Sequence, residues 1–275
     1  TVTYRAGGGI DHNVGAGKLT NIKSLKLKFN EATPTSTRVS IRDSFVSSNP
    51  SYAAGGEDPP TISELKTLIA AYRNSQSRIV TKQDLLARIY TMPTNFGRVF
   101  RAGVRSNNEN PLATQLFIIS RDANQKLIIS PDSLKENLKI YLNQFRLISD
   151  AIDILDAPVV NIGVSYNIVT DLSSNNASVL SSINVRIKNL LDISNIQIDQ
   201  PIIISDITNI ILNTLGVLSL DSLTVICKSG TIDERAYSET AINIDSYTDR
   251  GILMGPPGSI FEIKYPDSDI VGYVV

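Results

Sequence analysis

The sequence predicts an α+β fold made of several small modules, with β-rich ends flanking helical segments and a unit of two helices on a small sheet. Three observations lead to this prediction. From Leu25 to Phe29 apolar side chains occupy alternate positions, as in a strand with one solvent-exposed face. Thr61 and Thr81 each begin a capping box, the hydrogen-bonding pattern that opens a helix. Beyond residue 157, strand-like and helix-like segments alternate.

Residues 1–56 are expected to form a β-rich module. Glycines at positions 7–9, 15 and 17 mark turns, and from Leu25 to Phe29 apolar side chains alternate with lysines. Thr1 is not a methionine, and the first nine residues lack the charged start and apolar block of a secretory signal. We therefore expect a piece of a longer protein.

Residues 57–92 are expected to be a helical segment with two capped helices. The Thr61 hydroxyl and the Glu64 carboxylate can satisfy each other's backbone N–H groups at the first helix start. The same pairing is available to Thr81 and Asp84, with Val80 expected to pack on Leu85 as a hydrophobic staple. The first helix should carry one apolar face, made of Ile62, Leu65, Leu68, Ile69 and Tyr72.

Residues 93–156 are expected to combine short strands with one helix. The strands are expected at residues 99–104, 116–119 and 127–129. The helix should begin at Ser130, as cap, and Pro131, and run to near Arg146.

Residues 157–228 are expected to be the α+β module, and residues 229–275 a β-rich tail with a turn at Gly255–Gly258. The module should contain strand 159–169, helix 177–191, strand 202–204, helix 205–215 and strand 217–227. Gly216 is expected to be the left-handed residue that terminates the second helix.

The overall composition argues against several classes of partner. The formal net charge is −1, so no overall field favours nucleic acid or an anionic membrane surface. The most apolar window, residues 201–220, is interrupted by polar residues and is too poor in apolar side chains for a membrane helix. We therefore expect neither nucleic acid nor membrane as a partner, and the lack of disulfides fits synthesis in a reducing cytoplasm.

The residues that usually carry chemistry are scarce. A single histidine, His12, and a single cysteine, Cys227, exclude multi-histidine and four-thiolate metal sites, so no metal and no cofactor are expected. The run from Gly15 to Lys18 looks like a phosphate loop but lacks the required glycine at position 12 and the hydroxyl at position 19. We interpret it as turn glycines, His12 as a surface residue and Cys227 as core filler.

Acidic residues at short spacing leave one catalytic alternative open. Asp150, Asp153 and Asp156 recur every three residues, and Asp267 and Asp269 form a second group. A glycosidase needs two carboxylates facing each other across a cleft, which local spacing does not establish. Turns and solvated faces explain these residues as well, so no catalytic residue is assigned and the protein is not expected to be an enzyme.

Two blocks of sequence resemble a known family. The first is Asn13-Val14-x-Ala16-Gly17, together with Tyr4 to Gly8 before it. The second is Asn49-Pro50 to Gly55-Gly56-Glu57-Asp58, followed by Arg78-Ile79-Val80-Thr81-x-x-Asp84. Together they resemble the baseplate J-like family of contractile-tail phages, and within it the wedge proteins of T-even-type phages. The likeness covers about the first 90 residues; the family often has tyrosine where this chain has Leu85.

The resemblance implies a structural role. It implies that the matched positions hold a shared scaffold, namely Gly55, Gly56, Arg78, Val80, Thr81 and Asp84. It also implies a homodimer that contacts other baseplate wedge proteins, takes part in assembly and in the signal for sheath contraction, and belongs to the virion tail baseplate, assembled in the host cytoplasm. Two alternatives remain: a tail-associated cell-wall glycan hydrolase, and a host-receptor adhesin, which the aromatic content of 6% makes less favourable.

Overall fold

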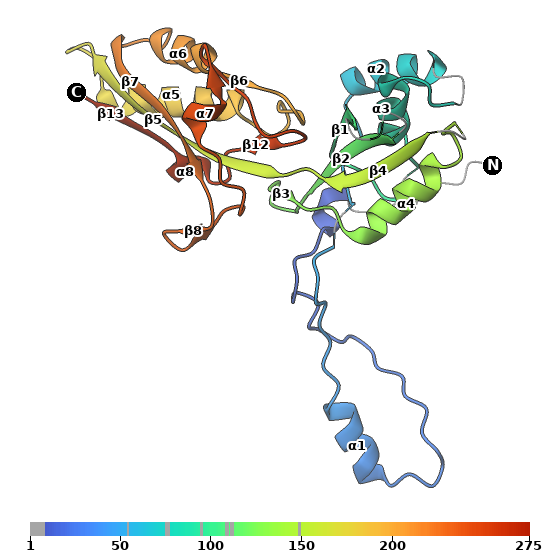
Figure 1. Cartoon of the computed structure of the whole chain (residues 1–275). Helices are drawn as coiled ribbons and strands as arrows, with labels where there is room; N and C mark the ends of the chain where they lie inside the picture. Colours follow the sequence, from blue (N-terminus) through green and yellow to red (C-terminus); the bar gives the residue numbers. More distant parts are fainter. Residues whose placement is uncertain are drawn as a thin grey trace.

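The computed structural model describes residues 9–53, 55–74, 78–93, 96–107, 110, 113–147 and 150–275. Figure 1 shows two units side by side and, below the first of them, an arm that carries a short helix. Each unit is built around a buried apolar cluster, and the cluster of the second unit also takes in Phe117 and Leu127 from the first. Helices and mixed sheets occur in both units, which confirms the predicted α+β class.

The first unit is organised around the central strand β2 (Ala113–Arg121). Strand β1 (Arg101–Ser106) lies antiparallel to β2, β4 (Ala151–Asp156) lies parallel to it on the opposite edge, and β3 (Leu127–Ile128) pairs with its end. Three helices accompany this sheet: α2 (Ile62–Asn74), α3 (Lys82–Tyr90) and α4 (Asp132–Leu142). The last two bury apolar side chains in the cluster of the first unit.

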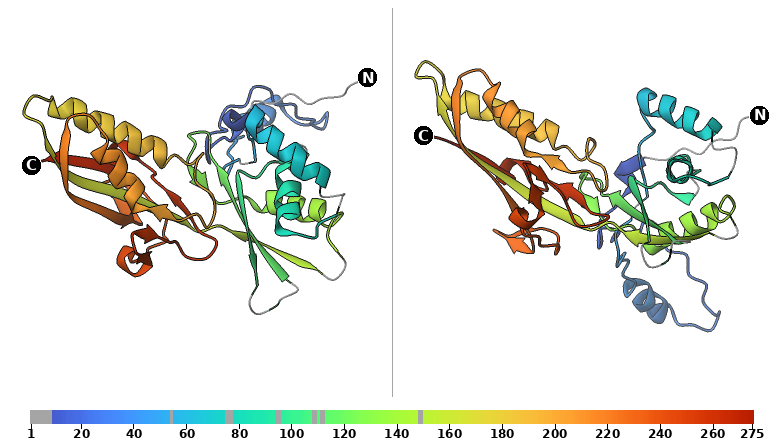
Figure 2. Two further views of the ribbon diagram at one scale, coloured as in Figure 1. Left: turned by 90° about the horizontal axis from the view of Figure 1, so that it is seen from above. Right: turned by 45° about the horizontal axis from the view of Figure 1, so that its top comes forward.

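The second unit is organised around the long strand β5 (Val159–Thr170). Strand β7 (Val217–Lys228) is antiparallel to it, and β12 (Ile260–Glu262) and β13 (Ile270–Val274) follow one another along its other edge, both parallel. Helices α5 (Asn176–Leu190) and α6 (Ile204–Leu212) cover one face of the sheet (Figure 2), as the sequence predicts. The side chains that alternate along β5 toward this face are fully buried: Val160, Ile162, Val164, Tyr166 and Ile168.

Smaller elements complete the chain. They are a 3-10 turn (Gly9–His12), α1 (Thr35–Asp43), β6 (Ile202–Ile203), β8 (Thr231–Ile232), β9 (Arg235–Ala236), α7 (Ile244–Tyr247), β10 (Thr248–Asp249), β11 (Ile252–Leu253) and α8 (Pro266–Asp269). Strands β8 and β9 form a hairpin, and β10, β11 and β6 form a small sheet. The predicted β-rich tail therefore contains strands but also two short helices.

A tight joint connects the two units. Strand β4 continues through Ala157 into β5 as one extended ribbon (Figure 1), and the Ala157 N–H donates to the Ile118 carbonyl oxygen at 3.0 Å. The Arg101 guanidinium donates to the carbonyl oxygens of Ser194 (2.7 Å) and Ile196 (3.2 Å) across the joint. Gly103 lies so close to Ile198 that a Cβ atom would be 2.5 Å from the Ile198 Cγ2. These hydrogen bonds and this close contact hold loop 192–199 against β1.

The prediction of a β-rich module at residues 1–56 is wrong for the residues that the structure describes. Between residues 9 and 53 the chain forms a 3-10 turn, irregular segments and helix α1, with no strand in that range. The alternation from Leu25 to Phe29 has the period of a strand, but no other segment that the structure describes pairs with it. Because a strand is defined by pairing, periodicity alone does not produce one.

Further details differ from the sequence prediction. Helix α4 begins at Asp132, and Pro131 occupies the N-cap position without a side-chain hydrogen bond to the helix. The expected cap, Ser130, is instead buried, and its hydroxyl lies 2.9 Å from the Ser120 hydroxyl in a hydrogen bond. Val80 is 60% exposed, and the neighbouring Ile79 is the buried residue, so the staple is absent. Strand β4 has no counterpart among the predicted strands.

Gly216 has the left-handed conformation that the sequence predicts, at φ +92°. It does not terminate the helix, however, because α6 ends at Leu212 and its C-cap residue is Asn213.

Candidate functional site

The two resembling blocks of sequence lie against each other in space. The Asn13 side chain, almost fully buried, donates through Nδ2 to the carbonyl oxygens of Gly56 and Arg121, both at 2.9 Å, and its Oδ1 accepts from the Gly56 N–H at 2.9 Å. A Cβ atom at Gly56 would lie 2.7 Å from Asn13 Oδ1 and would overlap the Gly9 carbonyl oxygen. Glycine at position 56 is therefore required for the two blocks to meet.

Asn49 makes a second connection between the same blocks. Its Oδ1 accepts from the Leu19 N–H at 3.0 Å, its Nδ2 donates to the Gly15 carbonyl oxygen at 3.0 Å, and its own carbonyl oxygen accepts from the Gly17 N–H at 2.8 Å. Gly17 adopts φ +70°, a left-handed conformation suited to glycine. The Gly15–Lys18 run is thus a turn closed by Asn49, as the turn interpretation predicts. We call the region formed by residues 13–17, 49–53 and 55–58 the neck.

A shielded ion pair fixes the neck to the first sheet. The Arg121 Nη2 lies 2.8 Å from the Glu57 Oε2, and the two side chains are only 14% and 7% exposed. The Arg121 guanidinium also lies over the Phe100 ring, 4.6 Å from its centroid. Burial raises the pKa of the Glu57 carboxyl above its ordinary value, although the hydrogen bonds and charge of Arg121 act in the opposite direction. Removing either partner would leave a buried charge unpaired.

The later motif residues form a helix start rather than a cavity. The Asp84 N–H donates to the Thr81 hydroxyl at 3.1 Å, and the Thr81 N–H donates to Asp84 Oδ2 at 2.9 Å, which completes the predicted capping box. Arg78 and Val80 are exposed beside it. Residues 4–8, which also belong to the resembling pattern, lie outside the described residues.

The neck carries a long arm, residues 18–48. Figure 1 shows it projecting away from both sheets, with α1 near its far end. Helix α1 has no buried residue, and the arm exposes the apolar side chains of Leu19, Ile22, Val39, Ile41, Phe45 and Val46. Its tip is held by Arg38, which donates to the carbonyl oxygens of Asn30, Glu31 and Thr33. The arm is folded locally but has little apolar burial of its own.

Helix α2 presents a second uncovered surface. Its N-terminus forms the predicted capping box, with the Thr61 N–H donating to Glu64 Oε2 at 2.8 Å and the Glu64 N–H to the Thr61 hydroxyl at 3.3 Å. Its predicted apolar face is exposed, however: Ile62 75%, Leu65 41%, Ile69 56% and Tyr72 48%. We call Ile62, Leu65 and Ile69 the α2 face; the Tyr72 ring lies over the buried Arg88 guanidinium, 4.6 Å from the ring centroid, and the side chain of Leu68 is not described. An amphipathic helix normally buries such a stripe.

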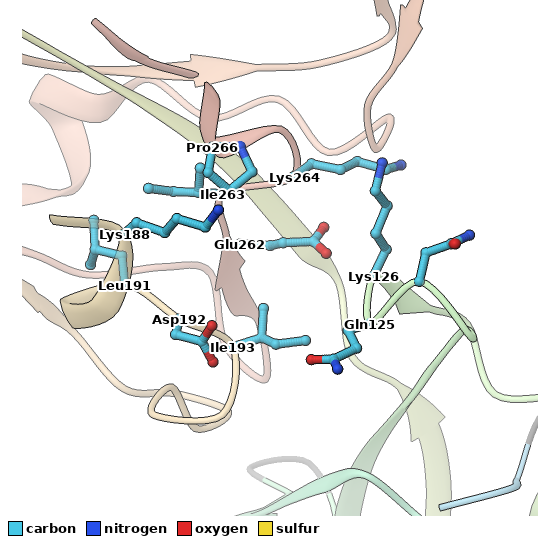
Figure 3. A pocket seen from close by; sticks show the side chains of 11 residues that line it. Gln125, Lys126, Lys188, Leu191, Asp192, Ile193, Glu262, Ile263, Lys264 and Pro266 are labelled. Carbon is cyan, nitrogen blue, oxygen red and sulfur yellow. The ribbon is translucent and has the colours of Figure 1, made fainter. Parts of the chain in front are cut away.

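A pocket of about 210 Å³ lies at the joint between the units (Figure 3). Glu262 lies beside it and is almost fully buried, and the pocket is also lined by Lys126, Lys188 and Lys264. Both Glu262 oxygens are engaged: Oε1 accepts from the Leu127 N–H at 2.8 Å and Oε2 from the Asn161 Nδ2 at 2.7 Å. This carboxylate therefore connects β3 to β12 and β5, which is a structural role.

A larger cavity of about 540 Å³ lies between the neck, β1 and loop 192–199. Arginines 98, 101 and 121 line it, together with Glu57 and Tyr90. Each arginine is already engaged: Arg101 and Arg121 as described, and Arg98 by donating to the Asp58 carbonyl oxygen. The cavity is thus lined by groups that hold the neck and the joint together and, on another side, by the first turns of α2.

The candidate chemical residues are dispersed. His12 is exposed on the 3-10 turn, as predicted, and Cys227 is half-buried on β7, where its Sγ accepts from the Ile242 N–H at 3.5 Å. Asp153 and Asp156 lie three residues apart on a strand and therefore project to opposite faces. Asp269 is buried in an ion pair with Lys228 at 2.8 Å, whereas Asp267 is exposed. Within the described residues, no group of three or more His, Cys, Asp or Glu could hold a metal ion.

Of three comparisons with known proteins, only the one with solved structures finds a match. No family model matches the sequence, and no curated protein matches it. A solved structure titled "Cryo-EM structure of the anti-feeding prophage (AFP) baseplate, 6-fold symmetrised" contains a similar chain, with a TM-score of 0.45 and 9% sequence identity. The match covers 82% of this chain and 44% of that one, so this chain spans less than half the length of its structural neighbour. In the described part of the chain, no helix is long and apolar enough to cross a membrane.

Proposed function

We propose that this chain is a structural component of a contractile-tail baseplate and works through contacts with other proteins. The observation that carries the proposal is the neck, where the two blocks of sequence that resemble the baseplate J-like family bind each other through Asn13, Asn49 and Gly56. Segments 34 to 43 residues apart in sequence thus form one structural element, as a shared scaffold requires.

The finer role that we propose is in a baseplate wedge, as a homodimer that takes part in assembly and in the signal for sheath contraction, within the virion. The arm and the α2 face support a role in assembly, because both have apolar side chains that the described part of this chain leaves exposed. Interfaces of permanent assemblies bury at least about 2,000 Å² and are apolar at their centres, so uncovered surfaces of this kind are what such a protein needs.

Binding to other wedge proteins tests the proposal. The purified chain is expected to be retained on immobilised wedge components and to migrate as more than a monomer in sizing runs at several concentrations. Retention by none of the wedge components would contradict the proposal.

A pair of matched variants assigns the binding to the α2 face. The double change Leu65→Gln and Ile69→Gln removes two apolar side chains that are exposed on α2, so we expect unchanged thermal stability and at least about tenfold weaker retention. Val185→Gln with Leu212→Gln makes the same change at similarly exposed helical positions of the second unit and should retain binding. Equal binding by both double variants would show that the α2 face is not part of the interface.

A further inference from the structure

The near-zero net charge conceals two strongly charged units. Residues 1–156, which contain the arm and the first sheet, carry twenty Lys and Arg against fourteen Asp and Glu. Residues 157–275 carry six Lys and Arg against thirteen Asp and Glu. The formal charges are therefore +6 and −7, which sum to the −1 of the whole chain. Segregation of this kind gives one molecule two surfaces that attract each other's copies.

The positive charge is concentrated on the arm. Residues 18–48 contain four lysines and two arginines against Glu31 and Asp43. Lys23, Lys26 and Lys28 are exposed, while the alternating Leu25, Leu27 and Phe29 are half-buried. The arm therefore combines a basic row with adjoining apolar side chains, on a segment that extends away from the body of its own chain (Figure 1).

Part of the negative charge of the second unit lies in exposed side chains of β7 and of the segment that follows it. The segment after β7 returns alongside it, since the Ile242 N–H donates to Cys227 Sγ and α7 packs on β7. Residues 221–250 carry six acidic residues against three basic ones. All six are exposed: Asp221, Asp233, Glu234, Glu239, Asp245 and Asp249. We call this set the acidic face.

We propose that the arm of one copy of this chain binds the acidic face of a second copy. The inference deepens the proposed function, on which it rests, by naming the partner of the arm. Charge complementarity indicates a second copy as the partner of the arm, because each copy has both a basic arm and an acidic surface of opposite charge. The contact joins unlike surfaces, so two copies can exchange arms reciprocally or continue as a closed ring.

The two parts of the arm have different tasks in this contact. Exposed ion pairs contribute little affinity individually, but several of one sign facing several of the other accelerate encounter and exclude partners of the wrong charge. The exposed apolar side chains of α1, such as Val39 and Ile41, supply the area that leaves water on docking. Self-association should consequently weaken as salt is raised, since exposed charges are screened over about 10 Å at 0.1 M.

Two complementary charge reversals test the contact. One variant reverses the arm by Lys23→Glu, Lys26→Glu and Lys28→Glu, and the other reverses the acidic face by Asp221→Lys, Glu239→Lys and Asp249→Lys. All six positions are exposed, so both variants are expected to fold, which circular dichroism and thermal melting check. As a matched control for the arm variant, Lys66→Glu, Lys82→Glu and Lys139→Glu makes the same change in net charge at exposed positions away from the arm.

Sedimentation velocity at about 50 mM salt, where exposed charges are weakly screened, measures the result. Each reversed variant alone should associate at least about tenfold more weakly than the parent chain, whereas an equimolar mixture should associate again, because the intact arm of one meets the intact acidic face of the other. The control should associate like the parent. A strictly monomeric parent, reversed variants that associate like the parent, or a mixture that stays dissociated would each overturn the inference.

The same samples separate this inference from the proposed function. If copies do not associate but the chain still binds immobilised wedge proteins, the arm has a different partner; the inference and the proposed homodimer fail, and the structural role in the baseplate stands. If neither self-association nor wedge binding occurs, both fail.

Discussion

Glu262 shows how a single buried residue supports the joint between the two units. Its carboxylate accepts two hydrogen bonds, from the Leu127 N–H and the Asn161 amide, and Asn161 in turn accepts from the Ser238 N–H at 2.6 Å. Burial raises the pKa of Glu262 above its ordinary value, although these hydrogen bonds act in the opposite direction. The sequence offers no sign of this role, because its partners lie 135 and 101 residues away.

The raised pKa of Glu262 predicts a pH dependence of stability. Between the unfolded pKa, near 4.5, and the higher folded pKa, the folded chain binds more protons than the unfolded chain. This contribution to the free energy of unfolding is therefore present at low pH and is lost as pH rises through that window. The loss is about 1.4 kcal/mol for each tenfold difference between the proton affinities of the folded and unfolded chains.

Urea unfolding at pH 5 and pH 7.5 isolates this contribution when the parent is compared with Glu262→Gln. The variant should lack this pH-dependent contribution. Its free energy of unfolding should also fall by roughly 1–3 kcal/mol at both pH values, since the amide NH2 group of glutamine must face one of the two donors, the Leu127 N–H or the Asn161 amide. Glu239→Gln, an exposed carboxylate, is the control and should follow the parent. An identical pH dependence in the parent and in Glu262→Gln would contradict the assignment.

At the scale of elements, capping chemistry has different consequences on the two N-terminal helices. Thr81 caps α3, which buries Leu85 and Ile89 in the first cluster, whereas Thr61 caps α2, whose apolar face is uncovered. Thr81→Ala is expected to lower the free energy of global unfolding by about 1 kcal/mol. Thr61→Ala should mainly increase local fraying, because α2 is coupled less to the core.

Chemical denaturation combined with amide hydrogen exchange separates global from local effects. The conservative Thr81→Ser keeps the hydroxyl and should restore most of the stability lost in Thr81→Ala. A loss of global stability in Thr61→Ala as large as in Thr81→Ala would show that α2 is as strongly coupled to the core as α3.

Local sequence signals predict the elements that depend on local contacts. The helix starts at Thr61 and Thr81, both helices of the second unit and its two long strands all lie close to their predicted positions. The strand expected from Leu25 to Phe29 does not form, because no segment among the described residues pairs with it. The sequence does not indicate β4, because its aspartates are equally typical of turns and surfaces. Strand formation depends on a partner that the strand's own residues do not specify.

Much of the candidate site is likewise formed by distant contacts. The resemblance draws attention to Gly55 and Gly56, but only the structure shows that Gly56 faces Asn13 and that Glu57 pairs with Arg121, 64 residues away. The exposure of the α2 face is also invisible in sequence, since an amphipathic stripe predicts burial without saying against what.

At the scale of the whole molecule, the joint decides whether the two units move independently. The β4–β5 ribbon, the hydrogen bonds of Arg101 and the contact of Gly103 with Ile198 all bridge the units. Interfaces between units of one chain are often mobile unless they are well packed. Because a continuous strand and a clamped loop both cross this joint, we expect the units to behave as one body, able to transmit force from one end to the other.

Gly103→Val tests that expectation, because its side chain must displace Ile198 while valine itself suits strand β1. Loop 192–199 should separate from β1, so its amide exchange is expected to rise by at least about tenfold while exchange in β2 and β5 stays slow. Arg105→Gln is the control: it removes the exposed ion pair with Asp199 at 2.9 Å without a steric clash, and such pairs contribute only about 0–1 kcal/mol. Unchanged exchange in Gly103→Val would mean that the ribbon alone holds the units together, and the clamp would then have no mechanical role.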